Sequence, residues 1–361
     1  MKKIGVVLSL LSIIFFSVCQ PIKAEENTKE RNDYTIGEIQ EILLNYLSEK
    51  GLEYEVGSEE FTNFVNDQVL NDTDKELTSR SDYELITAYM VEYLYELERL
   101  EVEKAGGQSN SVEYTEDALD ESEVQDELSL IEDKTLGDIK EEVESEEENV
   151  FDQEVAFNKQ GYDGSLSNVQ PKTMSFLSYN GHNKAYNVEY LSSGYSVAKA
   201  KKYVDKWYNS RNPYYDRFSS DCTNFVSQIL VAGGKSMKYP SYVPNGVNKN
   251  NNYWYMKTQS MVGVYVYNRS LSWAAVPEFY TYWSKRQSTK TSKSKQTIIS
   301  AAKAGDVVQF KKKGADRYSH TMFVYEKSNN TLYLSGHTDN YKKKNFKNIS
   351  SNWIEFRVIK F

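Results

Sequence analysis

The stretch SSDCTNFVSQILVAGG, residues 219–234, predicts a short helix that begins at a cysteine. Residue types that cap helix starts come before the cysteine, and a pair of glycines ends the run. The apolar side chains recur at helical spacing, at Cys222, Phe225, Val226, Ile229 and Leu230. Cys222 is therefore expected in the first turn, where unpaired backbone N–H groups and the helix dipole favour a thiolate. A thiolate attacks carbonyl carbons, although the position also suits a cysteine that acts as a small buried hydrophobic residue.

The first residues predict export, which makes this cysteine unusual. Residues 1–24 combine a basic start, an apolar run and a small-residue cleavage site, as a secretory signal does. The run from residue 4 to residue 18 is shorter than the roughly 20 residues of a membrane span, so no stable span is expected after signal removal. An uncleaved membrane anchor is the alternative. Loss of Cys19 with the signal leaves Cys222 without an internal disulfide partner in a secreted or cell-wall-associated protein.

The net charge of −9 over 361 residues hides two regions of opposite sign. Residues 25–150 hold 39 acidic and 9 basic side chains, whereas residues 151–361 hold 13 acidic and 31 basic ones. Such an asymmetry argues against one compact domain. The basic half would be attracted to anionic cell-wall polymers or to a membrane surface. It carries no RNA-binding or helix-turn-helix signature, so a nucleic-acid partner is not predicted.

The pattern along the chain predicts an α+β protein in several parts. An α-helical N-terminal region at residues 25–104 precedes an acidic, largely disordered linker at 105–178 and a globular domain at 179–361. Within the globular domain, the runs that are typical of strands lie at residues 306–310, 320–326, 331–336 and 353–361.

Two histidines follow the cysteine at positions that suit general base catalysis. His320 opens a predicted strand, where alternation places it on one face with Met322 and Val324. A histidine beside a helix that carries a cysteine supplies the base that a nucleophilic thiol needs, although a structural histidine is the alternative. His337 ends the next strand, where it would orient His320 or cap a turn.

Other polar residues compete with His337 as the third member of a triad. Asp339 and Asn340 follow it directly, Asp221 is a more distant candidate, and His182 is expected to be structural. The sequence contains no short pair of metal ligands, no phosphate-binding glycine loop, no dinucleotide fingerprint and no GxSxG motif. Neither a metal nor a cofactor is predicted.

Several strings together resemble a known family. NPYYDRFSSDCTNFVSQILVAGGKSM at 212–237 is followed by AGDVVQF at 304–310, SHTMFVY at 319–325 and YLSGHTDNY at 333–341. This order is similar to that of the putative amidase-domain family, in the papain-like group of the CHAP and NlpC-type cell-wall hydrolases. The resemblance covers about residues 179–361 and leaves out the acidic half. The sequence before the histidine, KKKGADRYSH at 311–320, departs from the acidic turn more common in the family.

The resemblance implies a papain-like C-terminal domain with Cys222 as nucleophile, His320 as general base and His337 as the residue that orients His320. The expected protein is an exported cysteine amidase or peptidase that cuts amide bonds through a thioester. Its substrate would be peptidoglycan, cut as an N-acetylmuramoyl-L-alanine amidase or an endopeptidase cuts it. A secreted protease or deamidase that acts on proteins and a non-catalytic wall-binding module are the alternatives. The acidic half would be a spacer, a partner-binding region or an inhibitory segment.

Overall fold

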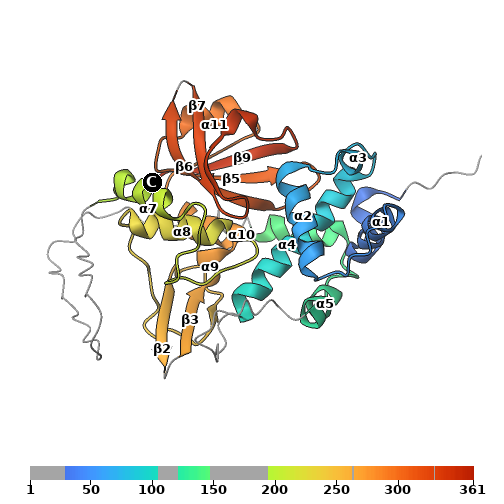
Figure 1. Cartoon of the computed structure of the whole chain (residues 1–361), viewed down its shortest axis with the longest axis horizontal. Coiled ribbons are helices and arrows are strands. Elements are labelled where there is room, and N and C mark those ends of the chain that lie inside the picture. The colour runs from blue at the N-terminus through green and yellow to red at the C-terminus, as the bar shows by residue number, and fades with distance from the viewer. Residues whose placement is uncertain (1–28, 105–120, 147–193, 262–263, 329) are drawn as a thin grey trace, which may run out of the picture.

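The computed structural model describes residues 29–104, 121–146, 194–261, 264–328 and 330–361 (Figure 1). The predicted signal, His182 and most of the predicted linker lie outside the described residues. In the described part of the chain, no helix has both the length and the apolar character needed to cross a bilayer.

The N-terminal helical region, residues 29–104 and 121–146, is a set of capped helices. They are η1 (Arg31–Asp33), α1 (Ile36–Glu49), α2 (Glu59–Asn71), α3 (Lys75–Thr78), α4 (Tyr83–Lys104), α5 (Glu121–Ser129) and a helical stretch at residues 136–146. Thr35 and Glu38 form a capping box at the start of α1, and the Ser58 hydroxyl accepts the backbone N–H of Phe61 at the start of α2. These caps satisfy backbone donors that a helix start leaves unpaired, so the polar residues before each apolar run set the helix boundaries.

The described part of the predicted linker differs from the expectation of a largely disordered segment. Residues 121–146 are mostly helical and pack into the N-terminal helical region. Their buried side chains form two sets, each with a three- or four-residue spacing: Val124, Leu128 and Ile131, then Leu136, Ile139 and Val143. One apolar stripe on each short helix is enough for packing despite the acidic composition, because the carboxylates lie on the solvent side.

The C-terminal region, residues 194–361, combines helices with two sheets. Its helices are α7 (Val197–Trp207), α8 (Cys222–Ala232), α9 (Leu271–Ala274), α10 (Val276–Ser284), α11 (Lys295–Ala301) and η2 (Phe346–Asn348). Its strands are β1 (Val247–Asn248), β2 (Met256–Met261), β3 (Val264–Ser270), β4 (Thr289–Ser292), β5 (Val307–Lys312), β6 (Tyr318–Ser328), β7 (Thr331–Gly336), β8 (Tyr341–Asn345) and β9 (Trp353–Ile359). The α+β class is confirmed, whereas the papain-like relationship stays a prediction.

The larger sheet has the strand order β4-β9-β5-β6-β7-β8, and all its neighbouring strands are antiparallel. Its side chains alternate between two buried faces. One face packs on α8 and α10 and includes Val307, Thr321, Phe323 and Ile359. The opposite face includes Val308, Phe310, Met322, Val324 and Val358. Figure 1 shows α8 and α10 beneath this sheet, with the β2–β3 hairpin projecting away from it.

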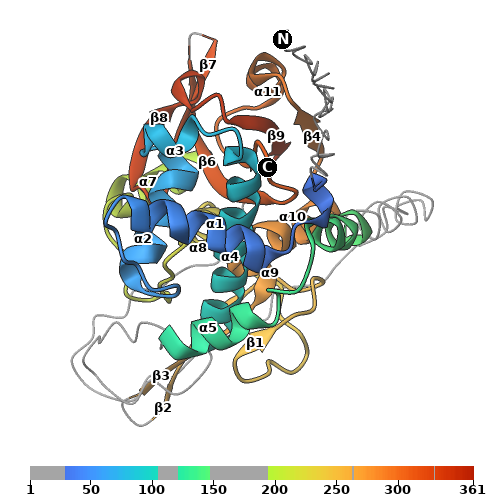
Figure 2. The ribbon, with the colours of Figure 1, turned by 90° about the vertical axis from the view of Figure 1, so that its right-hand side faces the viewer.

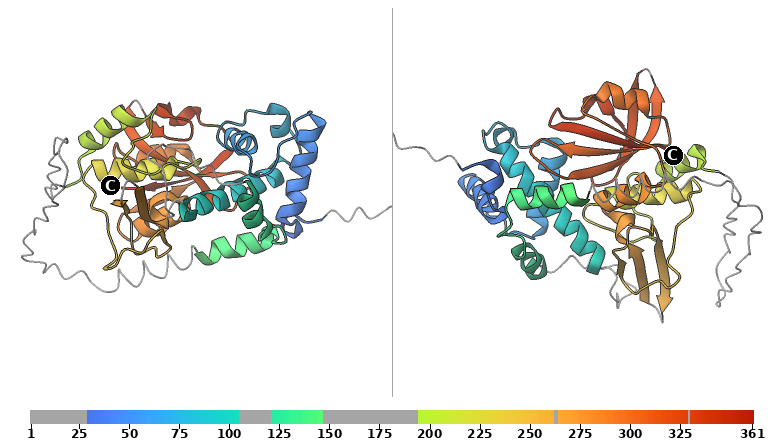
Figure 3. Two further views of the ribbon diagram at one scale, coloured as in Figure 1. Left: turned by 60° about the horizontal axis from the view of Figure 1, so that its bottom comes forward. Right: turned by 180° about the vertical axis from the view of Figure 1, so that it is seen from behind.

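One apolar cluster connects the N-terminal helical region to the sheet, which differs from the expectation that the two charged halves do not form one compact domain. Leu43, Phe61 and Tyr89 belong to the same buried cluster as Phe310 and Val324. Figure 2 shows α1 and α2 on the outer side of α4, and Figure 3 shows the helices around residues 121–146 reaching under the sheet. The charge difference therefore marks two surfaces that meet rather than two independent bodies.

A buried lysine ties the two regions together. Lys312, at the end of β5, is fully buried and its Nζ lies 2.9 Å from Asp72 Oδ1 at the C-terminal end of α2. It also donates to the carbonyl oxygens of Gln68, at 3.0 Å, and Val69. Burial lowers the pKa of Lys312 to about 8, against the opposing charge of Asp72. The ammonium caps the exposed carbonyls at the end of α2, where a positive charge is favoured.

We expect the substitution Lys312→Met to lower the free energy of unfolding by about 3 to 5 kcal/mol, because Asp72 is then buried without its cation. Chemical denaturation measured by circular dichroism tests this expectation. The double variant Lys312→Met with Asp72→Asn removes both charges and should recover part of the loss. Equal stability of the wild type and Lys312→Met would contradict the proposed tie.

Candidate functional site

Cys222 is the first residue of α8, as the sequence predicts. The helix buries apolar residues along its length because it lies between the sheet and α7 and α9. The preceding residue, Asp221, stands at the cap position but makes no side-chain bond to the helix backbone. Its carboxylate instead binds neighbouring side chains, so the first-turn backbone N–H groups beside Cys222 receive no carboxylate from it.

The thiol lies in a closed environment. Cys222 is 2% exposed and clusters with Val276 of α10 and Tyr318 of β6. Its Sγ lies 3.7 Å from the hydroxyl of Thr223, which donates a 3.0 Å hydrogen bond to the Thr321 hydroxyl. Strand β6 therefore meets the start of α8 through the face that carries Thr321.

Burial raises the pKa of Cys222 to about 12, and the carboxylate of Glu98 on α4 raises it further. The hydrogen bond with Thr223 and the backbone N–H of Thr321 act in the opposite direction but are smaller. The thiol is therefore protonated at neutral pH in this arrangement, although the helix start by itself favours a thiolate.

His320 lies on the opposite face of β6 from Cys222. Its ring packs near Phe310, with centroids 5.7 Å apart, and near Trp353, at 6.1 Å. The sequence prediction that His320 shares a face with Met322 is confirmed, but this face is turned away from α8. The structure does not bring Cys222 and His320 together, so their pairing as nucleophile and base stays a prediction.

The His320 ring faces a cavity of about 340 Å³ whose lining includes Asp339, Tyr341 and Lys344. No hydrogen bond to His320 is found among the described residues, and the side chain is more than nine-tenths buried. Burial lowers the pKa of His320 to about 4; Asp339 opposes this shift and Lys344 adds to it. Asp339, one of the candidates for the third member, lines the same cavity as His320 and favours the protonated form of the ring.

A β-bulge explains the placement of His320. Phe310 pairs with His320, but the next residue, Lys311, pairs with Tyr318, so Ser319 is an extra residue in β6. Tyr318 and His320 would share a face in a regular strand, and the bulge puts them on opposite faces. Tyr318 consequently contacts Cys222. The Ser319 hydroxyl is buried and, in the described part of the chain, has no hydrogen-bond partner.

His337 binds next to the cysteine rather than next to His320. Its Nδ1 lies 2.6 Å from Asp221 Oδ2 and its Nε2 lies 2.9 Å from the carbonyl oxygen of Trp207. The ring stacks on Phe225 of α8, with centroids 3.5 Å apart. Both ring nitrogens are engaged, so His337 holds the start of α8 in place and does not orient His320.

Asp221 is the centre of this small network. Its carboxylate accepts from Asn224 Nδ2 at 2.6 Å and lies 3.0 Å from Arg211 Nε, in addition to its contact with His337. Arg211 also donates to the side-chain oxygen of Asn340 at 2.9 Å, which places the remaining candidate on the outside of the network. Three segments of the chain, the loop after α7, the start of α8 and the loop after β7, thus meet at the residue before Cys222.

Helix α4 supplies neighbours of the site that the sequence analysis missed. Glu98 is buried, and its carboxylate accepts a 3.5 Å hydrogen bond from the backbone N–H of Val276. Glu101 accepts the backbone N–H of Ser219, three residues before Cys222, at 2.9 Å. The acidic residues inside the apolar stripe of residues 83–104 could have indicated this contact, because a carboxylate on a buried face needs a polar partner.

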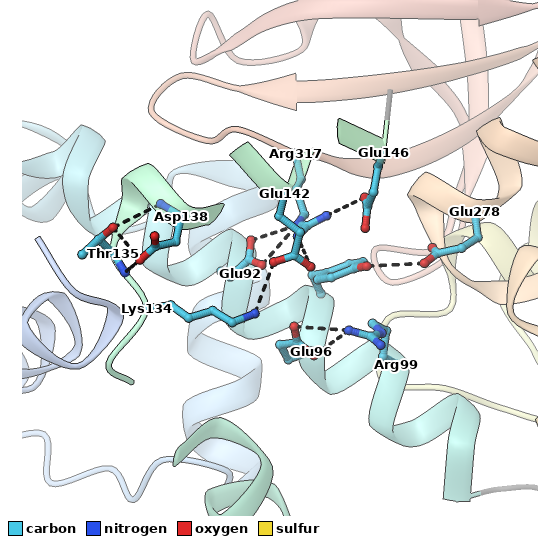
Figure 4. A network of polar contacts seen from close by, with 11 residues as sticks. Glu92, Glu96, Arg99, Lys134, Thr135, Asp138, Glu142, Glu146, Glu278 and Arg317 are labelled. Atoms are coloured by element: carbon cyan, nitrogen blue, oxygen red, sulfur yellow. Dashed lines mark hydrogen bonds and ion pairs between the residues drawn. The ribbon is translucent and has the colours of Figure 1, made fainter. Parts of the chain in front are cut away.

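A second contact of α4 lies at the start of β6 (Figure 4). Arg317 Nε lies 3.1 Å and 3.2 Å from the two carboxylate oxygens of Glu92. The same guanidinium contacts Glu142 at 3.3 Å and Glu146 at 2.9 Å, and it lies 4.1 Å from the ring centroid of Tyr95. This cluster joins α4, the helical stretch 136–146 and the hairpin between β5 and β6.

Three tryptophans of the C-terminal region are structural. Trp254 and Trp273 are fully buried and Trp283 is 4% exposed. Trp273 Nε1 donates to Asn224 at 2.7 Å and Trp254 Nε1 donates to Ser227 at 3.1 Å. These tryptophans hold α8 against its neighbours. In the described part of the chain, no group of three or more metal-ligating side chains is found.

Comparison with known proteins supports one activity class for the C-terminal region. Residues 194–359 match the sequence model of the family described as "Putative amidase domain", which covers just under half of the chain. The chain is also 31% identical over 143 residues to "Uncharacterized protein YhbB" of Bacillus subtilis (strain 168). That match covers 39% of this chain and 40% of the length of the relative. No solved structure matches the chain. The findings support an amidase-domain family for the C-terminal region and suggest hydrolysis of amide bonds.

The buried carboxyl of Glu278 predicts a pH-dependent stability. Burial raises the pKa of Glu278 to about 7, and its Oε2 has no hydrogen-bond partner among the described residues. Because the folded-state pKa lies above the unfolded value, the stabilising contribution is present at low pH and is lost as pH rises from about 4.5 to above 7. The wild type should therefore lose stability between pH 4.5 and pH 8, and Glu278→Gln should not show this loss. The free energy of unfolding of Glu278→Gln minus that of the wild type should be about 3 kcal/mol larger at pH 8 than at pH 4.5.

Denaturation curves of both proteins across this pH range test the expectation. Glu127→Gln, on the exposed side of α5, is the matched control and should give curves parallel to those of the wild type. A difference between Glu278→Gln and wild type that stays constant with pH would refute the assignment.

Proposed function

We propose that the C-terminal region is a cysteine-dependent amidase with Cys222 as its nucleophile. The observation that carries the proposal is the position of Cys222 at the start of α8, inside the residues that match the amidase-domain family. The first turn of a helix offers backbone N–H donors and a positive dipole end to a developing negative charge. These groups favour both the thiolate and the oxyanion that forms when sulfur attacks an amide carbonyl.

In the proposed reaction, the Cys222 thiolate attacks the amide carbon and a tetrahedral intermediate forms. The carbon–nitrogen bond breaks as the leaving amine takes a proton, and a thioester to Cys222 remains. Water then attacks the thioester, releases the carboxylic acid and returns the proton to the thiol. Each step moves one proton, so a single base beside the sulfur suffices.

His320 is the base that we propose, and it acts from a second arrangement of β6. Movement of the bulge past His320 would turn this side chain to the face of Cys222 and leave the strand from Met322 onward unchanged. Tyr318 would keep its face, beside the incoming ring. In this proposal, His337 acts through Asp221: it positions the start of α8 and takes no proton from the substrate.

Peptidoglycan is the substrate class that we propose. The predicted signal would export the chain, and the excess of basic residues after residue 150 suits an anionic wall. Exposed aromatic side chains favour a sugar or peptide polymer, since rings stack on such surfaces. Tyr214 and Tyr242 are each 76% exposed and Tyr239 is 43% exposed, in the loops that follow α7 and α8.

Digestion of purified peptidoglycan by the full chain, with mass spectrometry of the released fragments, tests this function. We expect Cys222→Ala to lower the rate by about 10³-fold or more, because no other group forms the thioester. His320→Ala should lower it to a similar extent, and the fragments identify the bond that is cut. Lys342→Met removes an exposed ion pair with Asp205 and cation–π contacts with two tyrosine rings. It is the control and should keep the wild-type rate.

Retention of full activity by Cys222→Ala would exclude a cysteine mechanism. Retention by His320→Ala alone would leave Cys222 as the nucleophile and assign the base elsewhere. Cleavage of protein substrates with no release from peptidoglycan would support a secreted protease instead.

A further inference from the structure

The surroundings of Cys222 include a helix from outside the residues that match the amidase family. We propose that α4 is a built-in inhibitor: the face of the C-terminal region around Cys222 binds α4 in the place of substrate. This inference rests on the proposed function, because it concerns access to the same thiol. The partner that this face recognises is therefore an acidic helix, present in the same chain.

The first support is the contact of α4 with a residue that encloses the thiol. Glu98 is bound to the backbone N–H of Val276, and Val276 packs against the Cys222 thiol. An amide substrate would need to approach Cys222 on a side that is open, but the thiol is 2% exposed. The Glu98 carboxylate also disfavours the thiolate. Glu98 thus holds Val276, which packs against the thiol, and adds an unfavourable charge.

The second support is the set of bonds that hold α4 at this place. Arg269 of β3 is fully buried and its Nε donates to the carbonyl oxygen of Val102 at 3.0 Å. Ser219 binds Glu101 on the side of α8, and the Tyr95 hydroxyl donates to Glu278 of α10 at 3.4 Å. These contacts come from the segment before α8, from α10 and from β3, so α4 is held from three directions.

The third support is the contact with β6, the strand that carries His320. Arg317 binds Glu92 of α4, and two residues, Tyr318 and Ser319, lie between Arg317 and His320. Arg317 and Glu92 are each 3% exposed, so this ion pair is shielded from solvent and from salt. The Arg317–Glu92 ion pair holds the start of β6 in the arrangement in which Tyr318, rather than His320, faces Cys222.

The contact between α4 and the C-terminal region also contains a destabilising group, which favours its release. Glu98 Oε1 is buried and has no hydrogen-bond partner among the described residues. Burial of an unsatisfied polar atom destabilises the closed arrangement, whereas an apolar side chain at this position would stabilise it. A permanent structural contact would gain from an apolar residue, so the carboxyl beside the thiol suits a contact that is released.

Alkylation of the Cys222 thiol in the full chain tests the proposal directly. Iodoacetamide at pH 8 is used as the probe, and mass spectrometry of the peptide that carries Cys222 gives the rate for this residue alone. The test variant is Arg317→Glu, which repels Glu92, Glu142 and Glu146 and so loosens α4 from β6. We expect the alkylation rate to rise about 10-fold or more over the wild type.

Two controls separate release of α4 from a general effect of charge. Lys313→Glu reverses a charge in the same hairpin, where Lys313 pairs with Glu84 of the same helix, but both side chains are 53% exposed. This variant should alkylate at the wild-type rate, because an exposed pair contributes little. Combining Arg317→Glu with Glu92→Arg restores an ion pair of opposite polarity and should slow the alkylation again.

The outcomes decide the proposal independently of the amidase function. The inhibitory role is overturned if Cys222 in the wild type is alkylated as fast as in the protein unfolded in urea. It is also overturned if Cys222 in Arg317→Glu is alkylated no faster than in the wild type. If Arg317→Glu loses its near-ultraviolet circular dichroism, Glu98→Gln replaces it as the test, and the same rise or its absence decides. Faster alkylation without any peptidoglycan release supports the cover and counts against the proposed function. Equal release of peptidoglycan fragments by the wild type and by Arg317→Glu supports the amidase function and overturns the inhibitory role of α4.

Discussion

The structure depends on the burial of the acidic face of α4 against the C-terminal region. Glu92, Glu98 and Glu278 all lie at this contact, and burial raises the pKa of each carboxyl. Transfer of a carboxylate out of water costs several kcal/mol unless a cation compensates for it. Arg317 compensates for Glu92, whereas Glu98 and Glu278 each keep an oxygen without a hydrogen bond among the described residues. The contact therefore survives because the apolar cluster shared with the sheet offsets its polar cost.

Much of the fold follows from the sequence, and the exceptions have physical causes. The stretch 331–336 is β7, residues 320–326 lie within β6, and α8 begins at Cys222 as predicted. These elements are local, because periodicity and helix caps fix them within a few residues. The helices at residues 121–146 were missed because acidic composition outweighed a short apolar stripe that gains stability only through packing.

The candidate site has features that sequence patterns cannot predict. Alternation along β6 correctly groups His320 with Met322, yet it cannot tell which face of the strand α8 covers. One extra residue, Ser319, decides whether His320 or Tyr318 faces the thiol. The neighbours contributed by α4 are likewise far from Cys222 in sequence, since Glu98 precedes it by more than one hundred residues. Patterns in the sequence therefore place Cys222 at the start of α8 and do not give its surroundings.

One short segment links the proposed cover of the thiol with the placement of His320, the proposed base. Arg317, Tyr318, Ser319 and His320 are consecutive, so a force on the first is transmitted to the last through three peptide bonds. While Arg317 is held by Glu92, the bulge stays at Ser319 and His320 stays on the far face. Departure of α4 frees Arg317 and removes Glu98 from the thiol in one movement. Uncovering Cys222 and freeing the strand that carries His320 are then a single event, because one helix restrains both.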